Sequence, residues 1–311
     1  MFKNLNAQTL GISGRQSDLI ELAMTYGFQG LDIDALDLER RTSRTDFERA
    51  TRFLLSSKMK VSGFDVPCDL DADDSEFEKA IGIVESVVKV AGKVKARAGY
   101  LVIPPATNKA PFPQFFELMK TRIVRLAKIF EENGVLLGLS LTTFQEDREG
   151  KQYPFIQDVN GALALIGACA SKSVGFVVDT YHWTAGQGTF EQLATLPPAQ
   201  VAGLNIADIA ESVDVKNSSR VMKLPAGTCG KIDNYKFVES LAYRGYDGPV
   251  TSCPDPANVG TITRDTTVSK AQDAIDAALK QAGLQTNTRK PEIVAAQSST
   301  GFDPPGFGEL P

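Results

Sequence analysis

Short apolar runs alternate along the chain with longer segments in which apolar residues recur at helical spacing. Eight of the short runs are rich in β-branched residues and are typical of buried strands. We predict strands at Thr9–Ile12, Gly30–Ile33, Lys60–Phe64, Tyr100–Ile103, Leu136–Leu141, Gly175–Asp179, Val201–Ile206 and Gly248–Ser252. Between them the pattern predicts helices at Asp18–Tyr26, Phe47–Leu55, Asp74–Arg97, Phe112–Asn133, Val159–Ala170, Phe190–Leu196, Tyr235–Tyr243 and Val268–Leu284.

This alternation predicts an α/β fold, a closed (β/α)₈ TIM barrel. Residues 5–284 give about 35 residues for each of the eight units, which suits a strand, a helix and two loops. Eight such units favour a closed barrel over an open doubly wound sheet. A dinucleotide-binding fold would need a GxGxxG turn after its first strand, and the segment GISGRQ does not fit that pattern. The phosphate-binding pattern GxxxxGK[ST] is also absent.

We therefore expect a single domain, a barrel over residues 1–284, followed by a C-terminal tail over residues 285–311. The tail has four prolines and three glycines among its 27 residues, a composition typical of segments without a packed core. One interpretation is a tail that is disordered or draped over the surface. The other is a strap across a neighbouring subunit of a homo-oligomer.

Charge and composition exclude several classes of function. The chain has 33 Lys and Arg against 38 Asp and Glu, a net charge of −5, which argues against a nucleic-acid partner because phosphate binding requires a basic surface. Its one histidine excludes a multi-histidine metal cluster. No apolar stretch reaches the roughly 18 residues of a membrane span, and the N-terminus does not resemble a signal peptide. The four cysteines lack CxxC spacing, which predicts reduced thiols in a cytoplasmic protein.

In such a barrel the active site forms at the C-terminal ends of the strands, so the polar residues just past each strand are the candidates for chemistry. They are Asp32, Asp34, Asp65, Cys68, Ser140, Thr142, Thr143, Asp179, His182, Asn205, Asp208, Cys253 and Asp255.

The sharpest local pattern is GFVVDTYHW, in which an apolar strand ends at Asp179 and His182 follows three residues later. In a turn this spacing places a carboxylate and an imidazole over one pocket, as metal ligands or as an acid/base pair. We expect Trp183 to form an apolar wall of the kind that stacks on a sugar ring. The alternative is that Asp179 caps the next helix and His182 lies on the surface.

This passage resembles the sixth strand of the xylose isomerase-like barrel superfamily, which includes sugar-phosphate isomerases and epimerases, keto-sugar 3-epimerases, hydroxypyruvate isomerases and the endonuclease IV group. Other passages are similar in order and spacing to the second, fifth and seventh strands and to the approach to the eighth. They are GFQGLDID, ENGVLLGLSL, VAGLNIADI and GTCGKIDNYKFVESLAYRGYDGPVTS. The resemblance covers about residues 5–284.

The resemblance implies one divalent metal (Mn, Mg, Co or Zn) held by Glu, Asp, His and Glu on strands five to eight. At these positions the chain has Ser140, Asp179, Asn205 and Cys253, so Asp179 is the one ligand that matches. Losing two carboxylates weakens a site for a hard cation by several kcal/mol. We therefore expect either an altered metal site with Asp179 and Cys253 as ligands or no metal at all. With His182 nearby, a softer metal such as zinc fits the altered site better than a hard cation. Without a metal, Asp179 would orient His182 as a general base.

We expect Asp179 and His182 to be catalytic and the substrate to be a small sugar or sugar-derived compound. Substrate contacts are expected from Trp183, Asn205, Asp208 and Arg220. The first hypothesis for function is an isomerase- or epimerase-like enzyme that transfers protons on a small sugar, sugar phosphate or hydroxy-keto compound. The second is a non-catalytic barrel that binds a carbohydrate or a protein partner. A DNA-repair nuclease would require several histidines and a basic groove, and the sequence has neither.

Overall fold

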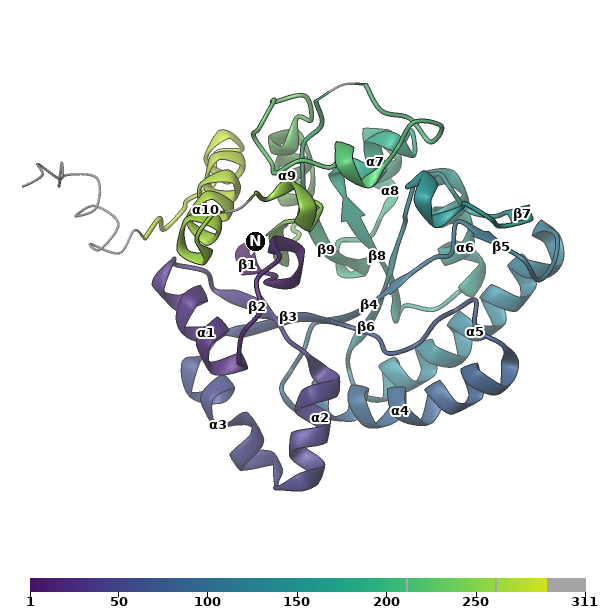
Figure 1. Ribbon diagram of the computed structural model, residues 1–311, viewed down its shortest axis with the longest axis horizontal. Helices are drawn as coiled ribbons and strands as arrows, with labels where there is room; N and C mark the ends of the chain where they lie inside the picture. The colour runs from purple at the N-terminus through teal and green to yellow at the C-terminus, as the bar shows by residue number, and fades with distance from the viewer. Residues whose placement is uncertain (211, 261, 290–311) are drawn as a thin grey trace, which may run out of the picture.

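The computed structural model describes residues 1–210, 212–260 and 262–289, which form a closed barrel of eight parallel strands surrounded by helices (Figure 1). The strands follow one another around the barrel in the order β1, β2, β3, β4, β6, β8, β9, β10, and β10 pairs with β1. The predicted (β/α)₈ fold is therefore confirmed.

The barrel strands are short and carry mainly buried residues. Their bounds are β1 (Phe2–Leu5), β2 (Gly30–Asp32), β3 (Lys60–Asp65), β4 (Ala98–Val102), β6 (Leu136–Ser140), β8 (Val174–Asp179), β9 (Val201–Ile206) and β10 (Pro249–Ser252). The helices are α1 (Gln16–Thr25), α2 (Ala35–Arg44), α3 (Phe47–Ser57), α4 (Asp74–Lys93), α5 (Phe112–Glu132), α6 (Val159–Cys169), α7 (Thr180–Ala185), α8 (Phe190–Thr195), α9 (Asn234–Tyr243) and α10 (Arg264–Gln281).

The prediction of the first strand is wrong. The strand is Phe2–Leu5, whereas the segment predicted as a strand, Thr9–Ile12, overlaps a short 3₁₀ turn at Gln8–Leu10. The reason is that β1 contains two polar residues, Lys3 and Asn4, which are both only 1% exposed. A pattern of apolar residues could not identify a strand whose polar side chains are buried against distant partners.

The structure also contains elements that the pattern did not predict. Helices α2 and α7 follow β2 and β8 directly, and a small antiparallel pair, β5 (Ala106–Thr107) with β7 (Tyr153–Pro154), joins two loops. Asp34 begins α2, because its side chain accepts a hydrogen bond from the Asp37 backbone N–H at 2.8 Å. It therefore does not share a strand face with Asp32.

A buried ion pair links the first strand to the last helix. The Lys3 ammonium lies 3.1 Å from the Asp276 carboxylate of α10, and it also donates to Gln272 at 3.2 Å. The chain beyond α10 covers this pair, since the Asn287 carbonyl accepts from Lys3 at 2.7 Å. The Arg289 backbone N–H donates to Gln272. The first residues of the predicted tail are thus packed on the barrel, and residues 290–311 lie outside the described residues.

In the described part of the chain, the helices are too short or too polar to span a lipid bilayer.

Candidate functional site

Several hollows among the described residues open at the C-terminal ends of the strands, where barrels of this kind form their active sites. The first, of about 220 Å³, is the lysine pocket, and Ser140, Asp179, His182, Asn205 and Lys223 contribute to its wall. The second, of about 400 Å³, is the aspartate pocket, and its wall includes Asn6, Asp32, Asp34, Asp65 and Tyr100. A third, of about 620 Å³, adjoins the aspartate pocket and shares Asp32 and Asp34 with it. Hollows of about 710 and 550 Å³ lie at the opposite ends of the strands, where the ion pair of Arg97 with Asp247 lines both.

Asp179 is the carboxylate at the centre of the lysine pocket. It is the last residue of β8 and the N-cap of α7, and it accepts backbone hydrogen bonds from Tyr181 at 3.1 Å and from His182 at 3.2 Å. The helix-capping interpretation of this residue is therefore correct. Only one carboxylate oxygen is used in capping, so the other is available for a partner across the pocket.

That partner is Lys223, which the sequence analysis did not single out. Its ammonium lies 2.7 Å from Asp179 Oδ2 and 3.6 Å from Cys253 Sγ. The Lys223 and Asp179 side chains are 7% and 8% exposed, so the ion pair is buried. Burial alone would raise the pKa of Asp179, but the adjacent ammonium reverses this effect and the pKa lies below its usual value. Burial would likewise lower the pKa of Lys223, and Asp179 raises it instead, so both groups remain charged.

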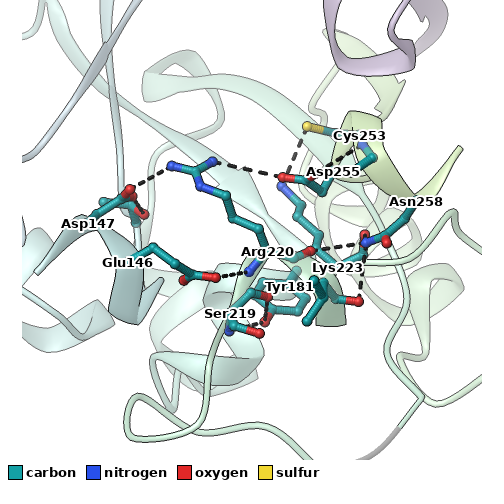
Figure 2. Close-up of polar contacts among 12 residues, drawn as sticks. Glu146, Asp147, Tyr181, Ser219, Arg220, Lys223, Cys253, Asp255 and Asn258 are labelled. Carbon is teal, nitrogen blue, oxygen red and sulfur yellow. Dashed lines mark hydrogen bonds and ion pairs between the residues drawn. The ribbon is translucent and has the colours of Figure 1, made fainter. Parts of the chain in front are cut away.

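The backbone of Lys223 is held firmly although it lies in the long connection after β9. Asn258 donates from its side chain to the carbonyls of Arg220 at 3.0 Å and of Lys223 at 2.9 Å (Figure 2). The Asp255 backbone N–H donates to the same Lys223 carbonyl at 3.0 Å. The loop after β10 therefore positions the cation that enters the pocket.

His182 presents one defined ring nitrogen to the pocket. Its Nδ1 accepts a hydrogen bond from the Thr143 backbone N–H at 3.2 Å. Because a backbone N–H can only donate, the proton of the neutral imidazole lies on Nε2. Burial, and then the Lys223 ammonium, lower the pKa of His182 to about 3. Asp179 contacts the backbone of His182 and not its ring, so the expected orientation of a basic imidazole by Asp179 is not found.

Arg220 stands at the rim of the lysine pocket. Its guanidinium donates to Asp147 at 2.6 Å and lies 3.9 Å from Asp255, so the arginine bridges two carboxylates (Figure 2). It also stacks 4.8 Å above the Phe144 ring. Because its side chain is 49% exposed, a ligand in the pocket can still reach it.

The positions that correspond to family metal ligands do not form a site for a divalent cation. Ser140 and Asn205 are neutral, and burial raises the pKa of the Cys253 thiol to about 12, so it is protonated at neutral pH. Asp179 is already paired with Lys223, so a metal ion bound to Asp179 would lie close to the Lys223 ammonium. Two like unit charges 4 Å apart repel by about 4 kcal/mol at an effective dielectric of 20, and a divalent cation would repel the ammonium by about twice as much. Among the described residues, no three His, Cys, Asp or Glu side chains are grouped to hold a metal ion. A metal on Asp179 and Cys253 therefore does not fit this geometry.

Two predicted substrate contacts lie elsewhere. Trp183 is 3% exposed and packs against Phe176 and Phe237, with ring centroids 6.0 and 6.5 Å away, so it belongs to the core and not to the pocket wall. Asp208 is fully buried and accepts backbone hydrogen bonds from the segment 229–232, for example from Gly230 at 2.6 Å. Its carboxylate is used to hold that loop.

The aspartate pocket contains a second carboxyl group, that of Asp32, which is half-buried. It accepts hydrogen bonds from the side-chain amides of Asn4 at 3.0 Å and Asn6 at 2.8 Å. Burial raises the pKa of Asp32 to about 7, and the nearby charge of Asp65 adds to this while the amide hydrogen bonds oppose it. Asp32 is thus a carboxyl group that changes its charge near neutrality.

The structure brings together Asp179, His182, Asn205, Arg220 and Cys253, as the sequence analysis expects, and adds Lys223. A lysine in a loop is ordinarily exposed, so its type gives no reason to expect burial. The available signal was weak: Met222 and Leu224, which flank Lys223, are apolar and half-buried, whereas the apolar Val221 beside them is exposed.

Comparison with known proteins agrees with this fold. A sequence profile described as xylose isomerase-like TIM barrel matches residues 20–286. No functionally curated protein sequence matches the chain.

Solved structures share the fold at low sequence identity. A xylose isomerase domain protein from Alicyclobacillus acidocaldarius has a TM-score of 0.78 and 19% identity over 91% of this chain and 99% of its own. The IolI protein with a bound zinc atom has a TM-score of 0.76 and 14% identity over 91% and 99%. D-psicose 3-epimerase from Clostridium cellulolyticum H10, solved with D-tagatose, has a TM-score of 0.68 and 14% identity over 92% and 100%. At these identities the likeness establishes the shared fold.

Proposed function

The chain belongs to the xylose isomerase-like TIM barrel family, and from this premise we propose that it is an isomerase- or epimerase-like enzyme for a small sugar or hydroxy-keto compound. The observation that carries the proposal is the buried pair of Asp179 and Lys223 in a pocket at the C-terminal ends of the strands. The pocket of about 220 Å³ suits a ligand of a few carbon atoms, and its wall offers several hydrogen-bond donors.

In this proposal the chain's own side chains replace a metal in the proton transfer. A carbonyl oxygen of the substrate accepts from Lys223, which stabilises the negative charge that develops when the neighbouring carbon loses its proton. His182 Nε2–H donates to a second substrate oxygen. Asp179 is the proton acceptor, and because the pKa of its carboxyl is lowered it is a weak base. We therefore expect a slow enzyme.

The proposal is tested by hydrogen exchange in heavy water. The protein is incubated with D-fructose, D-psicose, D-tagatose or hydroxypyruvate, and the signal of the proton next to the carbonyl is followed by NMR. Wild type should exchange this proton in at least one compound, and Asp179→Asn should slow the exchange at least tenfold. Asp247→Asn, the same change at an exposed residue at the opposite ends of the strands, serves as the matched control.

A second candidate function is ligand binding without turnover. It is favoured by the pairing of the pocket carboxylates, since Asp179 is bound to Lys223 and Asp147 to Arg220, so neither is an unengaged base. Saturation-transfer NMR on the same compounds separates the two: binding with no exchange in any compound would support this candidate and contradict the first.

A further inference from the structure

Lys223 occupies a distinctive place in the lysine pocket, because it lies between two positions that correspond to family metal ligands. Its Nζ contacts Asp179 at the end of β8 and Cys253 just after β10, and both residues stand at the carboxyl edge of the barrel. A single positive charge therefore lies where side chains from the two strand ends converge.

The hydrogen bonds of this ammonium are incomplete. A lysine ammonium has three N–H donors. Within the described residues, Lys223 Nζ has two hydrogen-bond partners, the Asp179 carboxylate and the Cys253 sulfur. The lysine also contributes to the wall of the lysine pocket, so its third N–H is available to a ligand in the pocket.

Alternative explanations of a buried lysine do not account for this arrangement. A purely structural ion pair needs no cavity beside it. The pair of Lys3 with Asp276 is an example, because Gln272 and Asn287 cover it. The lysine pocket remains open, and within the described residues the side chains of Asn205 and Ser140 in its wall make no hydrogen bond that would close it. A cation beside an open polar space is the arrangement expected for binding a ligand oxygen.

We infer that the Lys223 ammonium is a built-in cation in place of a divalent metal, and that it binds a carbonyl, enolate or carboxylate oxygen of the ligand directly. The identity of the ligand oxygen rests on the proposed function. The replacement of the metal by Lys223 does not rest on it. The loop contacts of Asn258 and Asp255 hold the Lys223 backbone, so the cation is positioned before the ligand arrives.

The first experiment uses Mn²⁺ alone as the probe, followed by electron paramagnetic resonance. Wild type should not bind Mn²⁺ in the pocket, and Cys253→Glu should not bind it either, because the new carboxylate pairs with Lys223. The double variant Cys253→Glu/Lys223→Met has two carboxylates and no ammonium, so it should bind Mn²⁺ at least tenfold more tightly than Cys253→Glu.

Two results would overturn the inference. One is stoichiometric Mn²⁺ binding to wild type that Asp179→Asn abolishes, and the other is equal Mn²⁺ affinity of the single and double variants. If the double variant does not fold, as shown by circular dichroism, the comparison of wild type with Asp179→Asn still decides the question.

The second experiment uses oxalate, a small planar anion that mimics an enolate, in the presence of EDTA. Calorimetry should detect binding to wild type, retained in Lys223→Arg and weakened at least tenfold in Lys223→Met. Unchanged binding in Lys223→Met, or absence of binding to wild type until Mn²⁺ is added, would contradict the inference. If Lys223 proves to bind oxalate but no substrate exchanges its proton, only the proposed enzymatic function fails. If exchange is found but requires Mn²⁺, only this inference fails.

Discussion

The lysine pocket and the aspartate pocket each contain a carboxyl group, Asp179 buried and Asp32 half-buried, and the two groups differ in charge because their partners differ. Asp179 faces the Lys223 ammonium at 2.7 Å, and its pKa lies below the usual value. Asp32 faces two neutral amides, Asn4 and Asn6, and burial raises its pKa to about 7. The comparison teaches that two amide hydrogen bonds do not offset the loss of hydration of a carboxylate, whereas one cation does.

The comparison has a chemical consequence. A carboxylate paired with a cation, such as Asp179, is a weak base that stays ionised, whereas a carboxyl group with a pKa near 7 can both give and take a proton at neutral pH. The same barrel edge therefore presents a fixed charge pair on one side and a titrating group on the other. The following substitutions test whether the charge of the hydrogen-bond partner explains the difference in pKa between Asp179 and Asp32.

The largest effect is expected when the cation is removed. Lys223→Met leaves the buried Asp179 carboxylate without its ammonium, and breaking a buried pair in this way costs about 3–5 kcal/mol. Denaturant unfolding at pH 7, followed by circular dichroism, measures the loss. The double variant Lys223→Met/Asp179→Asn should recover much of it, since no charge is then left unpaired. Equal unfolding midpoints for the single and double variants would show that the pair does not set the charge of Asp179.

A smaller effect is expected at Asp32, and it depends on pH. The pKa of this carboxyl is about 7 in the folded chain against an ordinary value of 3.8, so its ionisation opposes folding. Its contribution to stability is present below about pH 4 and is lost as the pH rises through 7. Asp32→Asn cannot ionise and therefore does not lose this contribution. The stability of the variant relative to wild type should increase by about 2 kcal/mol between pH 4 and pH 8. This is roughly half of the free energy that a pKa shift of about three units allows, because nearby groups relax when Asp32 ionises. A difference between the two proteins that is independent of pH would contradict the assignment.

The smallest effect is expected when a cation is introduced beside Asp32. Asn6→Lys places an ammonium within reach of the carboxyl that Asn6 now contacts at 2.8 Å, which imitates the arrangement around Asp179. The pKa of Asp32 should fall by at least one unit, about 1.4 kcal/mol, as measured by carbon-13 NMR of the carboxyl signal. Asn6→Met, of similar length and without charge, is the control, and it should not lower this pKa. If both variants give the same pKa, the partner's charge is not the cause of the difference between the pockets.

Most of the barrel could be predicted from the sequence because its strands are apolar runs of the right length and spacing. The segment Val174–Asp179 illustrates this, since its burial on both faces produces an uninterrupted apolar pattern that ends at a carboxylate. β1 could not be predicted, because Lys3 is buried by a partner 273 residues away and no local pattern encodes such a partner.

The candidate site was predicted in part for the same reason. Asp179 and His182 follow a strand directly, so their position could be inferred from the strand alone. Lys223 comes from the middle of a long connection, and its contacts are 44 and 30 residues away in the sequence. The role of Trp183 was predicted from its residue type, but the side chain points into the core, where Phe176 and Phe237 surround it.

The ion pair of Lys3 with Asp276 bears on how the barrel closes. A barrel formed from one linear chain has a seam where its first and last strands meet, and here Lys3 pairs in register with Val250 across that seam. The contacts of Lys3 with α10 and with Asn287 link the first strand to the last helix and to the segment that follows it, across the seam. Joining distant parts of a chain costs loop-closure entropy, which rises only slowly with loop length, and contacts across the seam help to offset it. A chain shortened to Leu284 would keep every strand and helix of the described residues and still lose the contact of Lys3 with Asn287, so the packed barrel extends beyond α10.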